Sequence, residues 1–311
     1  MPSRARILPE PPPTVAPMPD WARVERHENP FEGPIFLAGA ALAALHPAAR
    51  HDHPIGGLWR QRLALKAAAA VAGVVGRRED ESGLRDAHYL TKAGDDPGPA
   101  GKLLRVYRAI GDPHRLASDE WAEDVLDLLD LRDSAEAGQL FREIGRAMSQ
   151  TAGPVQAAAR AAAACLSLGA TGRILAPWVA DMLLAQRLRW RAPIPLLAIG
   201  LRSGDWRSAR EGRTDLWEDC CALAYARAAA TALDLHADLG RRAMQLLEAT
   251  PKLRGKEASA IVERLLAEDA QSASAGRMTS DRSARRLFER LVELGVAREL
   301  TGRPTFRLYG L

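Results

Sequence analysis

The stretch from Thr279 to Leu311 constrains the fold of this chain most, because an amphipathic helix signal is followed directly by two short β-prone runs. Apolar residues recur there at the spacing of one buried helical face. They are Ala284, Leu287, Phe288, Leu291 and Leu294. Thr279 or Ser280 suits the helix N-cap, and Gly295 suits a C-terminal stop with positive φ. The sequence therefore predicts a helix that covers a core with one face.

The two β-prone runs, Val296–Leu300 and Thr305–Tyr309, flank the turn sequence Thr301-Gly302-Arg303-Pro304. A glycine free to take positive φ and a proline that fixes the exit are typical of a hairpin turn. A helix followed by a hairpin is the outline of a winged helix-turn-helix, a module that often binds nucleic acid. We therefore expect a mainly α protein with a multi-helix body and a C-terminal winged helix-turn-helix that bears a short β-hairpin.

Arginines on this predicted module are the candidate DNA-binding residues. The helix carries Arg282, Arg285, Arg286 and Arg290, and the hairpin carries Arg298, Arg303 and Arg307. From Arg277 to the end, arginines exceed acids by the same +4 that the whole chain carries. An excess of this kind can neutralise DNA phosphates. Arginines on a helix surface are also commonly only solvated, and winged helices also serve as dimer or docking modules, so protein–protein contact stays open.

The composition favours helices and an intracellular protein. Hydrophobic residues make up 47% of the chain and aromatic residues only 5%, so alanine and leucine carry the apolar content. The three cysteines, Cys165, Cys220 and Cys221, lack metal-ligand spacing and cannot form a disulfide framework, which suits a reducing cytoplasm. The apolar run Ile35–Leu45 is too short to cross a bilayer. We expect a cytoplasmic protein without a membrane partner, and no cofactor is predicted.

The predicted organisation has four parts. These are a Pro-rich mobile arm over 1–30, a helical region over 31–133, a central helical region over 134–254 and the winged helix-turn-helix over 255–311. Trp21 is expected to hold the end of the arm against the body. The predicted helices of the body cover 36–46, 57–76, 99–110, 119–129, 135–149, 154–168, 174–188 and about 215–247. We expect the last of them to break near Gly240, because glycine is a poor helix former.

Two clusters outside the C-terminal stretch contain candidate site residues. His46, His51 and His53, with Asp52, could ligate a metal, but solvated loop histidines are the favoured interpretation and no metal site is predicted. Gly169 to Arg173 is predicted to form a glycine-bounded loop before an apolar helix. Backbone amides at a helix start, with Gly172 and Arg173, could hold an anion. A plain helix–helix turn is the favoured alternative.

The order of this glycine-bounded loop, the apolar helix, the stretch RAPIPLLAIGLR and a C-terminal winged helix resembles the Fic fold. That family transfers a nucleotide monophosphate to a protein hydroxyl with the loop H-P-F-x-[DE]-G-N-G-R. When this motif is ended at Arg173, Cys165 takes the place of its basic His and Gly169 that of its magnesium-binding acid, and only Gly172 and Arg173 match. Without the base and the metal ligand, nucleotide transfer is expected to be lost.

The whole chain resembles a bacterial family of unknown function, number fourteen-oh-three in the domain-of-unknown-function series. The stretches WRQRLALKAAAAVAGVVGRREDESGLRDA, GDDPGPAG and RELTGRPTFRLYGL carry the resemblance. That family implies no activity. Our hypothesis is a non-catalytic regulator, a pseudoenzyme, that binds DNA through its C-terminal module. The alternatives are a protein–protein interaction or scaffold module, such as a homodimer, and a divergent Fic-type nucleotidyltransferase.

Overall fold

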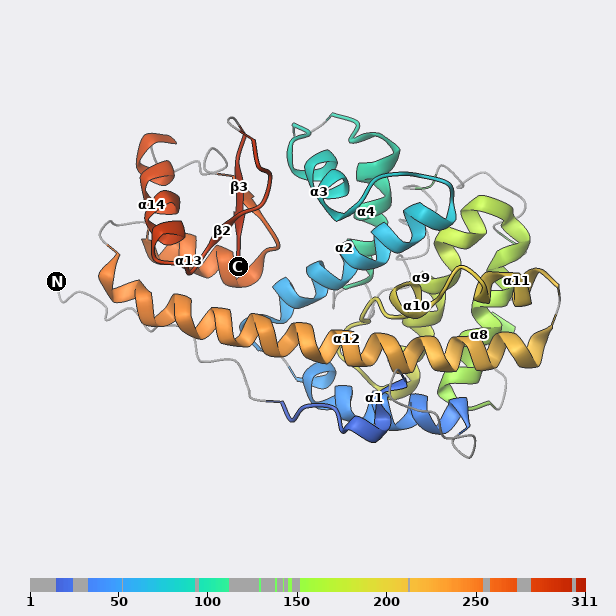
Figure 1. Cartoon of the computed structure of the whole chain (residues 1–311). Helices are drawn as coiled ribbons and strands as arrows, with labels where there is room; N and C mark the ends of the chain where they lie inside the picture. The colour runs from blue at the N-terminus through green and yellow to red at the C-terminus, as the bar shows by residue number, and fades with distance from the viewer. Residues whose placement is uncertain are drawn as a thin grey trace. The chain divides into compact units, whose positions relative to one another are not determined.

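A computed structural model of the full chain shows a mainly helical protein with a small antiparallel sheet near the C-terminus (Figure 1). The structure describes residues 15–24, 33–51, 53–92, 95–111, 152–211, 213–253, 258–272, 281–303 and 306–311, with a few isolated positions between 112 and 151. The predicted helices 119–129 and 135–149 and most of the N-terminal arm lie outside the described residues. The coarse prediction of a mainly α fold with C-terminal strands is confirmed.

The contacts divide the chain into two compact units, which are described separately. The large unit contains Val15–His51 and Arg62–Asp234. The small unit comprises the described residues within Asp52–Gln61 and Leu235–Leu311. The domain boundaries that we expect at 30, 133 and 254 remain predictions.

Helices of the large unit follow the alanine- and leucine-rich segments, as expected from their high helix propensity. They are α1 Pro34–Arg50, α2 Gly56–Val74, α3 Glu81–Tyr89, α4 Gly98–Ile110, α8 Pro154–Cys165, α9 Gly169–Leu188, α10 Leu197–Gly200, α11 Asp205–Arg210 and α12 Thr214–Ala249. Helices α2 and α12 each continue into the small unit.

The structure corrects two predictions about this helical region. Helix α9 begins at Gly169 and not at Ile174, so the predicted loop from Gly169 to Arg173 is already the first turn of the helix. Helix α12 runs without a break past Gly240 to Ala249. Glycine lowers helix propensity by only about 1 kcal/mol, which the packing of a long helix readily offsets.

Helices α8 and α9 pack against each other (Figure 1). Twelve residues of α9 are buried, including Trp178 and Asp181. The indole of Trp178 donates a 2.9 Å hydrogen bond to the carbonyl oxygen of Val106, and the Tyr107 hydroxyl donates one of 2.9 Å to that of Ile174. These bonds tie α4 to α9 and satisfy polar atoms that would otherwise be buried without partners.

The short helix α10 is held by polar groups at both ends. The buried carboxyl of Asp181 accepts hydrogen bonds from the backbone amides of Leu196, at 2.8 Å, and Leu197, at 3.1 Å. The guanidinium of Arg227 on α12 donates to the carbonyl oxygen of Gly200, the last residue of α10. An isolated helix of one turn is not stable in water, so these contacts and its burial define α10.

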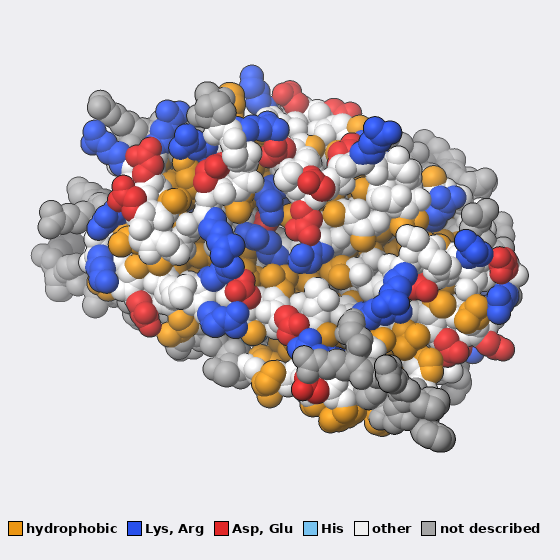
Figure 2. All heavy atoms as spheres, in the orientation of Figure 1, with side chains coloured by type: hydrophobic (Ala, Val, Ile, Leu, Met, Phe, Trp, Pro, Cys, Tyr) orange, Lys and Arg blue, Asp and Glu red, His pale blue; other side chains and the backbone are white. Residues whose placement is uncertain are grey.

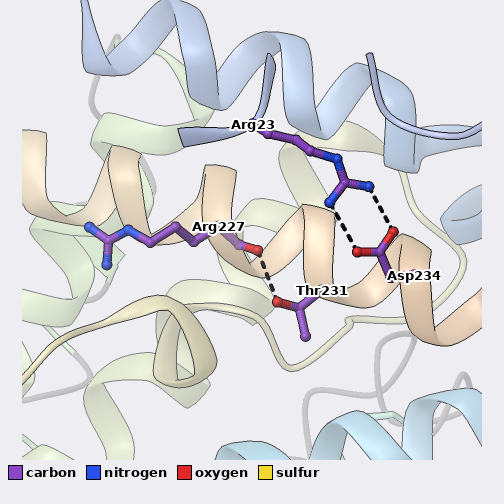
Figure 3. Close-up of polar contacts among 4 residues, drawn as sticks. All are labelled: Arg23, Arg227, Thr231 and Asp234. Carbon is purple, nitrogen blue, oxygen red and sulfur yellow. Dashed lines mark hydrogen bonds and ion pairs between the residues drawn. The ribbon is translucent and has the colours of Figure 1, made fainter. Parts of the chain in front are cut away.

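The segment before α1 contacts the body through an ion pair as well as through the expected tryptophan. Arg23 makes a bidentate pair with Asp234 of α12, with N–O distances of 3.0 and 2.7 Å, as Figure 3 shows. One turn earlier on the same helix, the Thr231 hydroxyl donates to the carbonyl oxygen of Arg227. Trp21 stacks on Phe36 with ring centroids 5.9 Å apart, yet both rings remain about half exposed. Bidentate geometry makes Arg23 the more specific anchor.

In the small unit, α13 (Ala258–Ala267) and α14 (Asp281–Glu293) accompany a sheet of three very short strands, β1 Gln271–Ser272, β2 Arg298–Glu299 and β3 Leu308–Gly310. The strand order is β1-β3-β2, and both pairings are antiparallel. The predicted hairpin is therefore present, although its strands are shorter than expected. The sequence did not predict β1, because a strand of two residues is too short to show an alternation of apolar and polar side chains.

Two histidines meet in the core of the small unit. The rings of His53 and His236 lie 4.7 Å apart, edge to face, and His236 also meets the ring of Trp59 at 5.4 Å. His53 is 8% exposed and His236 only 2%, so the prediction that His53 is solvated is wrong. Among the described residues, no group of three His, Cys, Asp or Glu side chains is placed to hold a metal ion.

This histidine pair should make the protein sensitive to acid. Burial, and secondarily the neighbouring His53, lower the pKa of His236 to about 4. Between the ordinary pKa of 6.5 and about 4, the unfolded chain takes up a proton that the folded chain excludes. Stability should therefore fall as pH drops through this window, by about 3 kcal/mol in total.

The test is to compare urea unfolding of the wild type and of His236→Phe, which keeps an aromatic ring without a titrating nitrogen, from pH 7.5 to 4.5. The stability of the wild type relative to the variant should decline with acid. A difference that is constant across this range would contradict the assignment.

Candidate nucleic-acid interface

Helix α14 is anchored by one apolar face, as its sequence pattern predicts. Ala284, Phe288 and Leu291 are buried. Phe288 stacks on Tyr309 of β3 with centroids 4.5 Å apart and ring planes 10° from parallel. Gly295 ends the helix with φ +71°. The stacked pair ties the helix to the sheet, so the opposite face of α14 has a fixed orientation relative to the hairpin.

The basic side chains of α14 that the structure describes point to solvent. Arg285, Arg286 and Arg290 are all exposed; Arg282 lies on the helix, but its side chain is outside the described residues. Arg290 forms a 3.0 Å ion pair with Glu293, and both side chains are more than half exposed. Such a pair contributes little to stability but partly neutralises the guanidinium.

Charge is distributed unevenly along α14. Arg282, Arg285 and Arg286 outnumber Asp281 in its first half, whereas Glu289 and Glu293 outnumber Arg290 in its second half. Figure 2 shows the same mixture over this part of the molecule, where Lys and Arg side chains are interleaved with acidic ones. The N-terminal half of α14 is therefore its more positive end, and the helix dipole adds to that sign.

The hairpin presents the other predicted arginines. Arg298, Arg303 and Arg307 are exposed. The Nε of Arg307 donates a 3.1 Å hydrogen bond to the carbonyl oxygen of Arg303, which holds the two residues together on one side of the turn. Phe306 between them takes φ +56° and is 72% exposed, an unusual position for a large apolar side chain.

Glu299 organises the turn. Its carboxylate accepts hydrogen bonds from the amides of Thr301, at 2.9 Å, and Gly302, at 3.0 Å, and from the Thr301 hydroxyl. Gly302 has φ +62°, as the turn sequence predicts. Partial burial acts to raise the pKa of Glu299, but these hydrogen bonds lower it below its ordinary value. One negative charge is therefore built into a hairpin that carries three arginines.

Two arginines that the sequence reasoning missed lie near Arg298. A pocket of about 160 Å³ is lined by Arg241 and Arg242 of α12 together with Arg298. Asp238 also lines it, and forms ion pairs of 3.2 Å with Arg241 and 2.7 Å with Arg242. Only tertiary contacts bring these residues to β2, since the sequence separates them by more than fifty positions. Arg298 thus shares a pocket with two arginines of α12.

The second candidate pair, Gly172 and Arg173, has a different setting from the one predicted. Gly172 is buried within α9, and a Cβ built on it would lie 2.0 Å from the carbonyl oxygen of Cys165. Arg173 donates a 3.3 Å hydrogen bond to the carbonyl oxygen of Val74. The glycine therefore permits close approach of α8 and α9. Anion binding at this pair remains an untested prediction.

One described helical stretch, 154–188, has the length and apolar composition of a membrane span. It comprises α8 and α9, which are separated by a 3-10 turn over Leu166–Leu168 and pack on each other. Buried core helices of soluble proteins meet the same criteria. The predicted cytoplasmic location and the predicted lack of a membrane partner stay predictions.

Taken together, fold and surface define a mainly helical protein that carries a three-stranded antiparallel sheet and an exposed basic helix at its C-terminal end. The chain belongs to a family of proteins of unknown function, DUF1403, whose model matches residues 11–311. The family resemblance stated from the sequence is thereby confirmed. A search of the curated proteins finds no match.

Proposed function

We propose that the protein is a non-catalytic regulator that binds duplex DNA through α14 and the β2–β3 hairpin. The observation that carries the proposal is the exposure of Arg285 and Arg286 on a helix whose other face is fixed by Phe288 and Tyr309. Guanidinium groups held on a rigid element can meet phosphates or base edges with little loss of conformational freedom.

The element order α13, β1, α14, β2, β3 and the strand order β1-β3-β2 support a winged helix as the binding module. In helix-turn-helix proteins, residues near the N-terminus of the recognition helix contact bases. The more positive half of α14 is the N-terminal half, which suits such an arrangement. Arg303 and Arg307 would then follow the phosphate backbone or enter a minor groove.

Binding should depend steeply on salt. We expect fluorescence anisotropy with a labelled duplex to show affinity that falls between 50 and 200 mM KCl, with a slope of about −0.9 for each phosphate contacted. The double variant Arg285→Ala/Arg286→Ala should weaken binding and reduce the magnitude of that slope by about 2. Arg207→Ala, an exposed arginine on α11 in the large unit, is the matched control and should leave both values unchanged.

Two results would contradict this function. One is the absence of duplex binding at 50 mM KCl, and the other is an affinity that the double variant does not change. Circular dichroism of each variant separates a lost contact from a lost fold.

Protein–protein docking is the second candidate, and the exposed ring of Phe306 favours it. Large apolar side chains in water are more typical of docking surfaces than of phosphate contacts. A homodimer that has no affinity for the duplex would favour this alternative. A Fic-like transferase has less support, because the matching residue Gly172 is buried in helix packing.

A further inference from the structure

The large unit contains a pocket whose lining residues are distant in sequence from the candidate DNA-binding arginines. Its described lining is mainly apolar. Its volume is about 430 Å³, within the range of small-molecule sites. Its walls are contributed by α1, by the start of α8 and by the end of α9. Ile35, Leu42 and Ala43 line it from α1, Val155 from α8 and Leu188 from α9. None of the described residues that line it has a charged side chain, so the body of a ligand here would be apolar.

One polar side chain that lines the pocket has a defined hydrogen-bond partner. His46 accepts a 3.0 Å hydrogen bond at Nδ1 from the indole Nε1–H of Trp190, which is buried. Because Nδ1 accepts this bond, Nε2 is the ring nitrogen that carries a hydrogen. His46 therefore brings a hydrogen-bond donor to a pocket in which Gln156 is the other described polar lining residue.

The start of α8 adds further donors to the same pocket. Gly153, Pro154, Val155 and Gln156 all line it. Gly153 is the N-cap of α8, and no side chain of the described residues caps this end. Pro154 has no N–H, so the donors within this first turn are the amides of Val155 and Gln156, which lack intrahelical acceptors. The helix dipole makes this end positive. The polar end of the pocket consequently offers hydrogen-bond donors from two independent sources.

We propose that this pocket binds a small amphipathic carboxylic acid. Its hydrocarbon or aryl body would lie between α1 and the end of α9, and its carboxylate would accept hydrogen bonds from His46 Nε2–H and the first amides of α8. The ammonium group of an amine only donates hydrogen bonds, so it would face these donors without accepting from them. The uncharged hydroxyl of an alcohol would gain little electrostatic stabilisation from the positive helix end. The proposal concerns the large unit alone and does not depend on DNA binding.

Gly39 allows the pocket to be filled without disturbing the fold. It lines the pocket on α1, and a Cβ built on it meets no atom within 4 Å. Gly39→Leu should therefore be accommodated, improve helix propensity and occupy the pocket. Gly73→Leu is the matched control, because Gly73 lies in α2, also has open space at its Cβ and does not line this pocket.

Calorimetric titration of the full chain with decanoate, decanol and decylamine tests the proposal, since the three probes share a chain and differ in the head group. We expect saturable 1:1 binding of decanoate at least tenfold tighter than that of the other two. Gly39→Leu should weaken it at least tenfold, and Gly73→Leu should leave it unchanged. His46→Phe should remove most of the preference for decanoate over decanol.

Three outcomes would overturn the proposal: no saturable binding of decanoate, equal affinity for decanoate and decanol, or binding that Gly39→Leu does not alter. Thermal unfolding of both glycine variants supplies the folding control, because each should be at least as stable as the wild type.

Discussion

Gly172→Ala and Gly200→Ala are each expected to lower the free energy of unfolding by about 4 kcal/mol. A loss of this size is a large part of the free energy that keeps a typical domain folded. A Cβ on Gly172 would lie 2.0 Å from the carbonyl oxygen of Cys165, and one on Gly200 would lie 1.9 Å from that of Ala224. In both cases the obstacle is backbone of a neighbouring helix, so no side-chain rotation can relieve the overlap. The helices α8 and α9, or α10 and α12, would have to move apart.

Urea unfolding followed by circular dichroism measures this effect, with soluble yield as the result if either variant fails to fold. Gly73→Ala is the control, since its Cβ has open space near the C-terminal end of α2. That substitution should raise stability by up to about 1 kcal/mol, because alanine has the higher helix propensity. If Gly172→Ala is as stable as the wild type, the close approach of α8 and α9 is incorrect.

These glycines also show where sequence reasoning reached its limit. Gly172 and Arg173 were considered for an anion site, because a glycine-rich segment before an apolar helix is typical of phosphate loops. The same spacing serves helix packing, since a residue without a Cβ lets two backbones approach closely. Which of the two applies depends on whether another helix lies against the glycine. The presence of that helix is a property of the tertiary structure, and no local sequence pattern shows it.

Predictions from local sequence patterns were confirmed where neighbouring residues alone determine the backbone conformation or the buried face of a helix. The face of α14 that carries Ala284, Phe288 and Leu291 is buried as its period predicts, and Gly295 and Gly302 take the positive φ values that their positions require. Strand β1, the pairing of Arg241 with Asp238 and the contact of His53 with His236 were not predicted. Strand β1 is too short to show a period, and His53 and His236 are distant in sequence. The Arg241–Asp238 pair is local, three residues apart on α12, and was simply not considered.

The sequence predicted only part of the candidate interface, because only that part depends on local periodicity. An arginine on the outer face of an amphipathic helix is exposed whenever the inner face is buried, so Arg285 and Arg286 followed from the period alone. The grouping of Arg298 with Arg241 and Arg242 required the fold. Adding α12 to the proposed interface would enlarge the surface available to a phosphate backbone, although Asp238 offsets part of that charge.

Asp181 is the buried group whose loss should have the second large effect. Asp181→Ala leaves the amides of Leu196 and Leu197 without their acceptor and opens a small cavity in the core. Each unsatisfied buried amide costs about 1–3 kcal/mol, so we expect a loss of about 4 kcal/mol in the free energy of unfolding. Asp181→Asn keeps one acceptor oxygen and should lose less than half as much.

The pH dependence distinguishes the role of this carboxyl from simple packing. Burial raises the pKa of Asp181 from the ordinary 3.8 to about 8, against the lowering effect of the two amides. Below pH 8 the folded protein therefore retains a proton that the unfolded chain releases above about pH 4. Wild-type stability relative to Asp181→Asn should consequently fall as pH rises from 5 to 8.

This trend is opposite in sign to the one expected for His236, because folding retains a proton at the aspartate and excludes one at the histidine. Urea unfolding of the two variants at the same set of pH values therefore separates the two contributions. If the stability difference between the wild type and Asp181→Asn does not vary from pH 5 to 8, the carboxyl is already ionised in the folded state. The two amide hydrogen bonds would then outweigh the cost of burying its charge.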